Sequence, residues 1–250
     1  MIETFLGDIV FLVDTSSQMG TSNFESQKQF VKLVAKSLNV GPERSRAAII
    51  TYGNTSTQPD DSDLFSSLPE FYRAVDGSRF IGGPRRMNYA VDGAEKLLRT
   101  ANRNVYKLVV LLTAGKQFHQ QDIILLEQSF KKLRETGTKT FVVAIGSDYD
   151  NTELLPGVET AEDIFSVVSF DGLARQAWET SKEIAERTGE FCHERMEEKR
   201  TTTKIVKTLL FLKMRDLSIL LPLFFMTLVI TCIVRPFRVV FFYYDNQMAL

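Results

Sequence analysis

The polar turn at residues 14–20 has the composition of a cation site. It reads Asp-Thr-Ser-Ser-Gln-Met-Gly and directly follows the apolar run at residues 9–13. A dinucleotide site needs several glycines here, so that backbone amides can approach pyrophosphate, and only Gly20 is present. Carboxylate and hydroxyl oxygens instead suit a hard divalent cation such as Mg²⁺. The turn is therefore the first place to look for a binding site.

Short apolar runs alternate with helical stripes through the first 190 residues. The runs predict buried strands at residues 9–13, 47–50, 108–112, 141–145 and 164–168. Between two of them, apolar residues recur at three- and four-residue spacing from Met87 to Leu98, as in an amphipathic helix. This alternation predicts an α/β fold with a doubly wound, mostly parallel sheet and helices on both faces. Ligands of such sheets bind in the loops after the strands, which include the turn at residues 14–20.

Several short motifs resemble the von Willebrand factor type A domains of matrilins and collagen VI. The resemblance rests on residues 8–17, on Asn23-Phe24, on Val40-Gly41-Pro42 and on Ile81-Gly82-Gly83, and it continues with residues 109–113 before Gly115. It covers residues 6–190 in unbroken order. It implies the doubly wound sheet already predicted, and a role in adhesion or matrix assembly.

The resemblance also implies a metal-ion-dependent adhesion site, of which this chain keeps only a part. The family pattern is D-x-S-x-S in the first loop, a Thr in the second, and an Asp within T-D-G in the third. Asp14 and Ser16 match, whereas Gln18, Arg85 and Ala114 stand at the altered positions. In the family, a partner carboxylate completes the coordination of the ion.

The altered positions disfavour Mg²⁺, although a degenerate site at Asp14 and Ser16 stays open. At 4 Å and an effective dielectric of about 20, Arg85 beside Asp14 would attract it by about 4 kcal/mol before desolvation, and would repel a cation by a comparable amount per unit of its charge. We therefore expect no cofactor, with Asp14 hydrogen-bonded in its turn. One hypothesis is that Arg85 or Arg86 replaces the ion and receives a partner carboxylate; the alternative is that both are solvated surface residues. The predicted partner-binding residues are Ser17, Gln18, Arg85 and Arg86.

Other features narrow the class of protein. The 250 residues carry a net charge of −1, which gives no electrostatic basis for binding nucleic acid. No Ser-His-Asp set, nucleophile elbow or phosphate loop is visible, so an enzyme is not expected. Asn54-Thr55-Ser56 is a glycosylation acceptor if the domain is exported.

The last sixty residues differ in character from the rest. We predict a domain at 6–190, a charged, basic linker at 191–216, a single transmembrane helix at 217–234 and a short tail at 235–250. Residues 217–234 contain no charged side chain and span about 27 Å as a helix. A buried core helix is the weaker alternative.

The side of the membrane stays open. The start of the chain shows no secretory signal. Six Lys or Arg lie in the twenty residues before the apolar run and two in the sixteen residues after it, so the positive-inside rule places the domain in the cytoplasm. The family resemblance instead places the domain outside the cell.

The sequence thus predicts a membrane-anchored module that binds a matrix or cell-surface protein through the loops above Asp14, without a metal. The alternatives are a metal-dependent adhesion receptor domain and an extracellular-matrix structural module that self-associates through its helices.

Overall fold

The computed structural model describes residues 6–60, 63–101, 103–117 and 119–213. The chain divides into two compact units, Met1–Glu194 and Arg195–Leu250. The family resemblance falls within the first unit.

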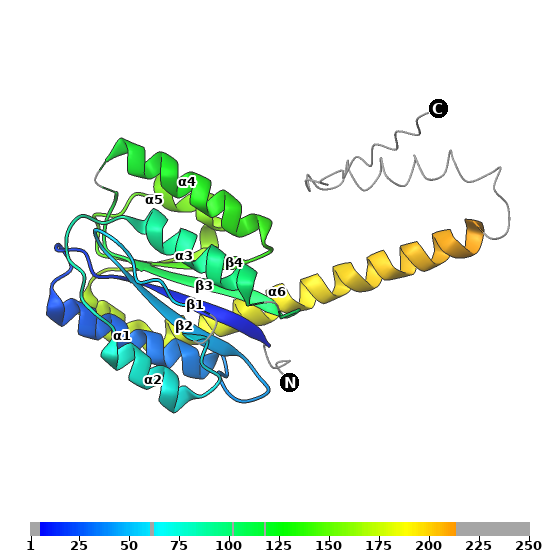
Figure 1. The fold of residues 1–250 in the computed structure, drawn as a ribbon, viewed down its shortest axis with the longest axis horizontal. Helices are drawn as coiled ribbons and strands as arrows, with labels where there is room; N and C mark the ends of the chain where they lie inside the picture. The colour runs from blue at the N-terminus through cyan, green and yellow to red at the C-terminus, as the bar shows by residue number, and fades with distance from the viewer. Residues whose placement is uncertain (1–5, 61–62, 102, 118, 214–250) are drawn as a thin grey trace. The chain divides into compact units, whose positions relative to one another are not determined.

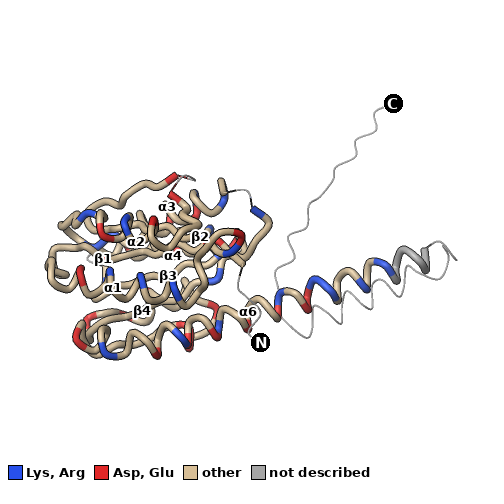
Figure 2. The backbone as a smooth tube through the Cα atoms, turned by 90° about the horizontal axis from the view of Figure 1, so that it is seen from below, with Lys and Arg blue, Asp and Glu red and all other residues tan. Residues whose placement is uncertain are grey.

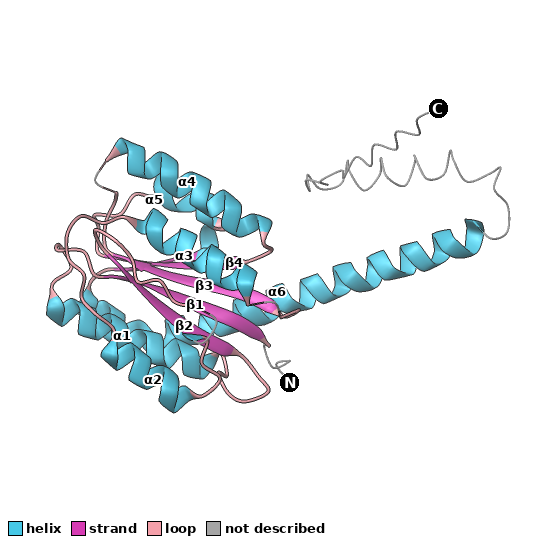
Figure 3. Cartoon of the chain, in the orientation of Figure 1, coloured by secondary structure: helices cyan, strands magenta, loops and turns pink. Residues whose placement is uncertain are grey.

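The first unit is built on a five-stranded parallel sheet (Figures 1 and 3). Its strands lie in the order β2-β1-β3-β4-β5, so the chain winds outward from β1 in both directions. The central strands are buried on both faces, which is why their sequences are continuous apolar runs. The predicted strands and the doubly wound sheet are confirmed. The bounds are Gly7–Asp14 for β1, Arg46–Tyr52 for β2, Tyr106–Thr113 for β3, Lys139–Ile145 for β4 and Ile164–Val167 for β5.

Helices cover both faces of this sheet (Figure 1). On one face, α1, α2 and the first part of α6 pack against alternate strand residues, such as Phe11 and Val110. On the other face, α3 and α4 pack against the intervening residues, such as Val10 and Val109. The bounds are Thr21–Ser37 for α1, Leu68–Gly77 for α2, Met87–Thr100 for α3, Gln120–Glu135 for α4, Asn151–Leu154 for α5 and Phe170–Lys213 for α6; two short 3₁₀ turns, η2 and η3, occupy Leu155–Gly157 and Ala161–Asp163.

Helix α6 continues beyond the predicted end of the domain. It packs against the sheet through Leu173, Ile184 and Phe191, and the first unit ends at Glu194. The segment that we predicted as a charged linker is helical as far as Lys213. Its charged composition is therefore carried on a helix.

Within the described residues, no helix is long and apolar enough to cross a membrane. The apolar run at 217–234, on which the predicted transmembrane helix rests, lies outside the described residues, as does the tail at 235–250.

Candidate functional site

Asp14 is the last residue of β1 and is fully buried at the carboxyl edge of the sheet. Its Oδ1 accepts a hydrogen bond from the Ser16 backbone N–H at 2.8 Å, which closes the turn after the strand. Its Oδ2 lies 2.5 Å from Arg85 Nε and 3.4 Å from the Ala114 backbone nitrogen. The structure thus brings Asp14 and Ser16 together with the two altered positions at 85 and 114.

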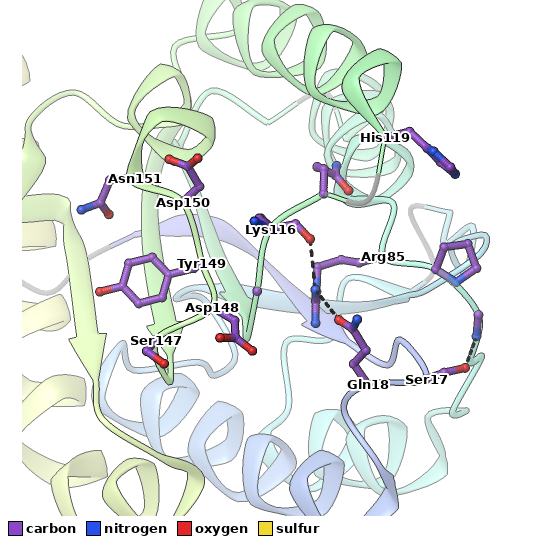
Figure 4. Close-up of a pocket in the computed structure, with 14 residues that line it drawn as sticks. Ser17, Gln18, Arg85, Lys116, His119, Ser147, Asp148, Tyr149, Asp150 and Asn151 are labelled. Atoms are coloured by element: carbon purple, nitrogen blue, oxygen red, sulfur yellow. Dashed lines mark hydrogen bonds between the residues drawn. The ribbon is translucent and has the colours of Figure 1, made fainter.

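Arg85 comes from the loop between α2 and α3, and its side chain is only 3% exposed. Besides the ion pair with Asp14, its Nη1 donates to Gln18 Oε1 and to the Lys116 carbonyl, each at 3.1 Å (Figure 4). Gly115 leaves the room for this guanidinium, because a Cβ there would lie 2.6 Å from Arg85 Nη1. Arg85 therefore links the loops after β1 and β3 through one buried cation.

Backbone hydrogen bonds hold the same loops in register. Ser17 donates its N–H to the Gly83 carbonyl at 2.9 Å and accepts the Gly83 N–H on its Oγ at 2.7 Å. Gly82 and Gly83 both have φ of 77°, a conformation that glycine adopts without strain. On the other side, the Lys116 N–H donates to the Asp148 carbonyl at 3.0 Å. The loops after β1, β3 and β4 and the loop before α3 are thus fastened into one surface.

A cavity of about 960 Å³ opens at this edge. The loop after β4 forms one side of it, across from the loops that carry Gln18 and Arg85 (Figure 4). We predicted nothing for this loop, although it follows a buried strand and the same topological rule applies to it. The lining residues are Ser17, Gln18, Gly83, Pro84, Arg85, Gly115, Lys116, Gln117, His119, Ser147, Asp148, Tyr149, Asp150 and Asn151.

Two neighbouring groups have altered proton affinities. Burial, and secondarily the charge of Asp14, raises the pKa of Tyr52 well above its usual value, and the Tyr52 hydroxyl donates to the Leu112 carbonyl at 2.8 Å. Burial also raises the pKa of Glu153, whose carboxylate accepts the Gln117 N–H at 2.8 Å. Both groups serve as hydrogen-bonding supports beneath the loops.

The side chains around Asp14 fit a divalent ion poorly. Asp14 Oδ2 faces the Arg85 cation, Gln18 Oε1 accepts from the same guanidinium, and Ala114 contributes only a methyl group. Ser16 Oγ and Arg85 Nη2 are buried without hydrogen-bond partners in the described structure. The described residues also contain no group of three His, Cys, Asp or Glu side chains suited to hold an ion.

The remaining predicted residues lie apart from Asp14. Arg86 donates from Nη1 to the Tyr89 hydroxyl at 3.1 Å, and its Nε is 4.0 Å from Asp122 Oδ2. Its side chain is 32% exposed. Asn54 is exposed beside the glycine loop, and its backbone N–H donates to the Gly82 carbonyl at 2.9 Å.

Three supporting residues were not predicted. The fully buried Gln27 of α1 donates from Nε2 to the Asp14 carbonyl at 2.8 Å, and Lys116 and Glu153 act as described above. Gln27 interrupts the apolar stripe of its helix. A polar residue at an otherwise apolar position was the only feature of the sequence that could have indicated its role. The contacts of the other two depend on loops that meet only in the folded chain.

The comparisons with known proteins agree with this architecture. The model of the von Willebrand factor type A domain matches residues 8–177. The human collagen alpha-6(VI) chain is 27% identical over 172 residues, covering 67% of this chain and 7% of the relative. Mouse matrilin-2 is 26% identical over 171 residues, covering 65% of this chain and 17% of the relative. The chain therefore spans only a small part of these relatives.

Solved structures show the same fold. Proximal thread matrix protein 1 from the mussel byssus has a TM-score of 0.63 and 25% identity, covering 73% of this chain and 47% of that one. A second structure of that mussel protein, described as having a zinc-occupied MIDAS motif, has a TM-score of 0.62 at 25% identity and covers 73% of this chain and 46% of that one. The family match over residues 8–177, on the sheet that the structure shows, establishes that this chain belongs to the von Willebrand factor type A domain family.

Proposed function

We propose that this chain is a metal-independent, protein-binding von Willebrand factor type A module of the adhesion or matrix class. The observation that carries the proposal is the buried ion pair between Arg85 and Asp14. It supplies a positive charge beside the aspartate and links loops that an ion would otherwise organise. Collagen VI and matrilin-2 among the relatives support the class of the partner.

The contact surface in this proposal is the rim of the 960 Å³ cavity. Ser17, Gln18 and Lys116 are exposed there, and the loops that carry them are tied together by Arg85 and the backbone. Arg85 acts by positioning these loops, since its side chain is only 3% exposed and its Nε and Nη1 already bind Asp14, Gln18 and Lys116. Arg86, which is partly exposed, is the arginine left to receive a partner carboxylate directly.

A calorimetric titration of the full chain with Mg²⁺ tests the metal-independent part of the proposal. We expect no binding by the native chain, because Arg85 would repel the ion. The Arg85→Thr, Ala114→Asp double variant should bind Mg²⁺, because it restores a hydroxyl and a carboxylate at the altered positions. Binding by the native chain would overturn metal independence and favour the metal-dependent receptor alternative.

Photo-crosslinking in cells that produce the full chain tests the contact surface. A photo-reactive residue replaces Gln18 at the loop edge or, as a matched control, the exposed Lys131 on α4 or the 62% exposed Trp178 on α6. We expect adducts with another protein at position 18 alone. Adducts confined to the helix positions, formed with a second copy of this chain, would instead support the self-associating matrix module.

We also propose that residues 217–234 anchor the chain in a membrane as a single span. The support is the sequence, with eighteen residues that include no charged side chain. The matrix proteins among the relatives support a position of the domain outside the cell. The excess of Lys and Arg before the apolar run supports the opposite side. We propose no enzymatic activity for this module.

A further inference from the structure

The second unit begins with a stretch of α6 that is exposed on all sides. Every side chain from Glu197 to Lys207 is exposed in the structure, although Ile205 and Val206 are apolar. Their exposed fractions are 44% and 48%. Within the described part of this unit, no packing partner accounts for these two residues.

From residue 199 onward, the charges of this helix have one sign. Residues 199–213 contain five Lys or Arg and no Asp or Glu. Blue segments recur along the outer part of α6 in Figure 2, up to the point where the tube is drawn in grey. Glu197 forms an ion pair with Arg200 at 2.8 Å, but both side chains are more than half exposed, so solvent screens the pair. The stretch therefore presents a net positive surface.

The helix also separates its cations from its apolar residues. Arg200, Lys204 and Lys207 are spaced by four and three residues, which places them on one face. At 3.6 residues per turn, Ile205 and Val206 fall on the opposite side, about half a turn away on average. A basic helix with an apolar side is the pattern of a helix that lies in a membrane interface.

We propose that residues 199–207 of α6 bind an anionic lipid surface through Arg200, Lys204 and Lys207. Phosphate and carboxylate groups of the lipids would pair with the cations, while the apolar side enters the headgroup boundary. Charge complementarity and the uncharged run that follows at 217–234 favour a bilayer over a soluble polyanion. The inference rests on the proposed membrane attachment and does not depend on the loop-edge site.

Flotation of the full chain with vesicles tests the inference. Phosphatidylcholine vesicles are compared with vesicles that also contain phosphatidylserine, at low and at high salt. We expect the anionic lipid to raise the partition of the native chain roughly a hundredfold, or about fivefold for each cation, and salt to weaken the gain. The Arg200→Gln, Lys204→Gln, Lys207→Gln variant should lose most of this gain.

A second triple variant controls for net charge. Lys96→Gln, Lys131→Gln, Lys132→Gln removes three exposed lysines from α3 and α4 and should keep the native gain. An equal gain for the native chain and the α6 variant would overturn the lipid inference while leaving the membrane anchor intact. Failure to float with either vesicle would overturn both. The native chain and the α6 variant are also compared for binding to RNA. If they differ in RNA binding but not in partition into either vesicle, the surface is a nucleic-acid contact and the lipid inference is wrong.

Discussion

At the scale of single residues, the site depends on one aspartate and on the cation that neutralises it. Asp14 is fully buried and Arg85 almost so, and the two are joined at 2.5 Å. A buried charge without its partner is costly, whereas the same pair at a surface contributes little. Arg85 should therefore matter to the stability of the fold as well as to the shape of the loops.

We expect Arg85→Ala to lower the free energy of unfolding by about 3–5 kcal/mol, because it leaves the Asp14 carboxylate buried and unpaired. Urea denaturation followed by circular dichroism measures the change. Arg86→Ala is the matched control, since Arg86 is partly exposed and makes only a peripheral pair, and should cost about 1 kcal/mol or less. Equal losses in the two variants would contradict a buried, structurally required ion pair.

Gly115 provides a second test at this scale. We expect Gly115→Ala to cost about 1–3 kcal/mol, because the added methyl group would lie 2.6 Å from Arg85 Nη1. In Gly77→Ala, at the end of α2, the added Cβ meets no atom within 4 Å, so little loss of stability is expected. The same denaturation assay compares them. If Gly115→Ala is as stable as Gly77→Ala, the guanidinium does not occupy the place described.

At the scale of elements, the short helix α5 carries a buried carboxyl group that binds a residue lining the cavity. Glu153 is 5% exposed and accepts the Gln117 N–H, which ties α5 to the loop after β3. Burial raises its pKa in the folded chain. Its contribution to stability is therefore complete below its unfolded value of 4.5 and is lost as the pH rises through the higher folded value.

We expect Glu153→Gln to become more stable relative to the native chain as the pH rises from about 4 to about 8, because the glutamine can still accept the hydrogen bond and carries no buried charge. Urea denaturation at both pH values measures this trend. Glu162→Gln is the contrasting control. Hydrogen bonds, chiefly from Thr160, lower the pKa of Glu162, so that variant should lose stability relative to native as the pH rises. If the stabilities of both variants changed in the same direction with pH, the raised pKa of Glu153 would be contradicted.

The helices show where local sequence signals were incomplete. We predicted no helix at residues 68–77, although Pro69 stands in the first turn and Phe71 and Val75 lie one turn apart and are buried. The stretch is only ten residues long, and its apolar pattern is brief. Its helical state is stabilised by packing against α1 and β2.

At the scale of the whole molecule, the proposed membrane attachment raises the question of which side of the membrane the first unit would occupy. An extracellular domain agrees with the matrix relatives. The proposed lipid-binding face on α6 instead favours the cytoplasmic leaflet, where anionic lipids are concentrated. One glycosylation experiment separates the two positions.

The experiment uses two acceptor sites on the full chain produced in mammalian cells. Asn54 is exposed within a natural acceptor triplet, and Met248→Thr creates a second triplet at Asn246 in the tail. If the domain is extracellular, a deglycosidase should change the electrophoretic mobility of the native chain but not that of the Asn54→Gln variant. If the domain is cytoplasmic, the enzyme should change the mobility of the Met248→Thr variant alone. Glycosylation at Asn54 would also contradict the proposal that residues 199–207 of α6 bind lipids of the cytoplasmic leaflet.

The sequence alone determined the fold and the family. Continuous apolar runs predict strands buried on both faces, and their alternation with helical stripes leaves few topologies other than the observed sheet. It also identified Asp14, Ser16, Gln18, Arg85 and Ala114, because each stands at or near the end of a predicted strand or in a motif of the family. These signals are local, so they can be read from neighbouring residues.

Only the tertiary structure decided how those residues are used. Asp14 and Arg85 are 71 residues apart in the chain, and their ion pair exists because separate loops meet at one edge of the sheet. The same folding sets Arg86 apart, brings Gln27 and Lys116 to the site, and adds the loop after β4 to the cavity. The burial of a charged group and its distance from residues remote in the sequence determine which partner it binds and how strongly. Neither can be read from the neighbouring residues in the sequence.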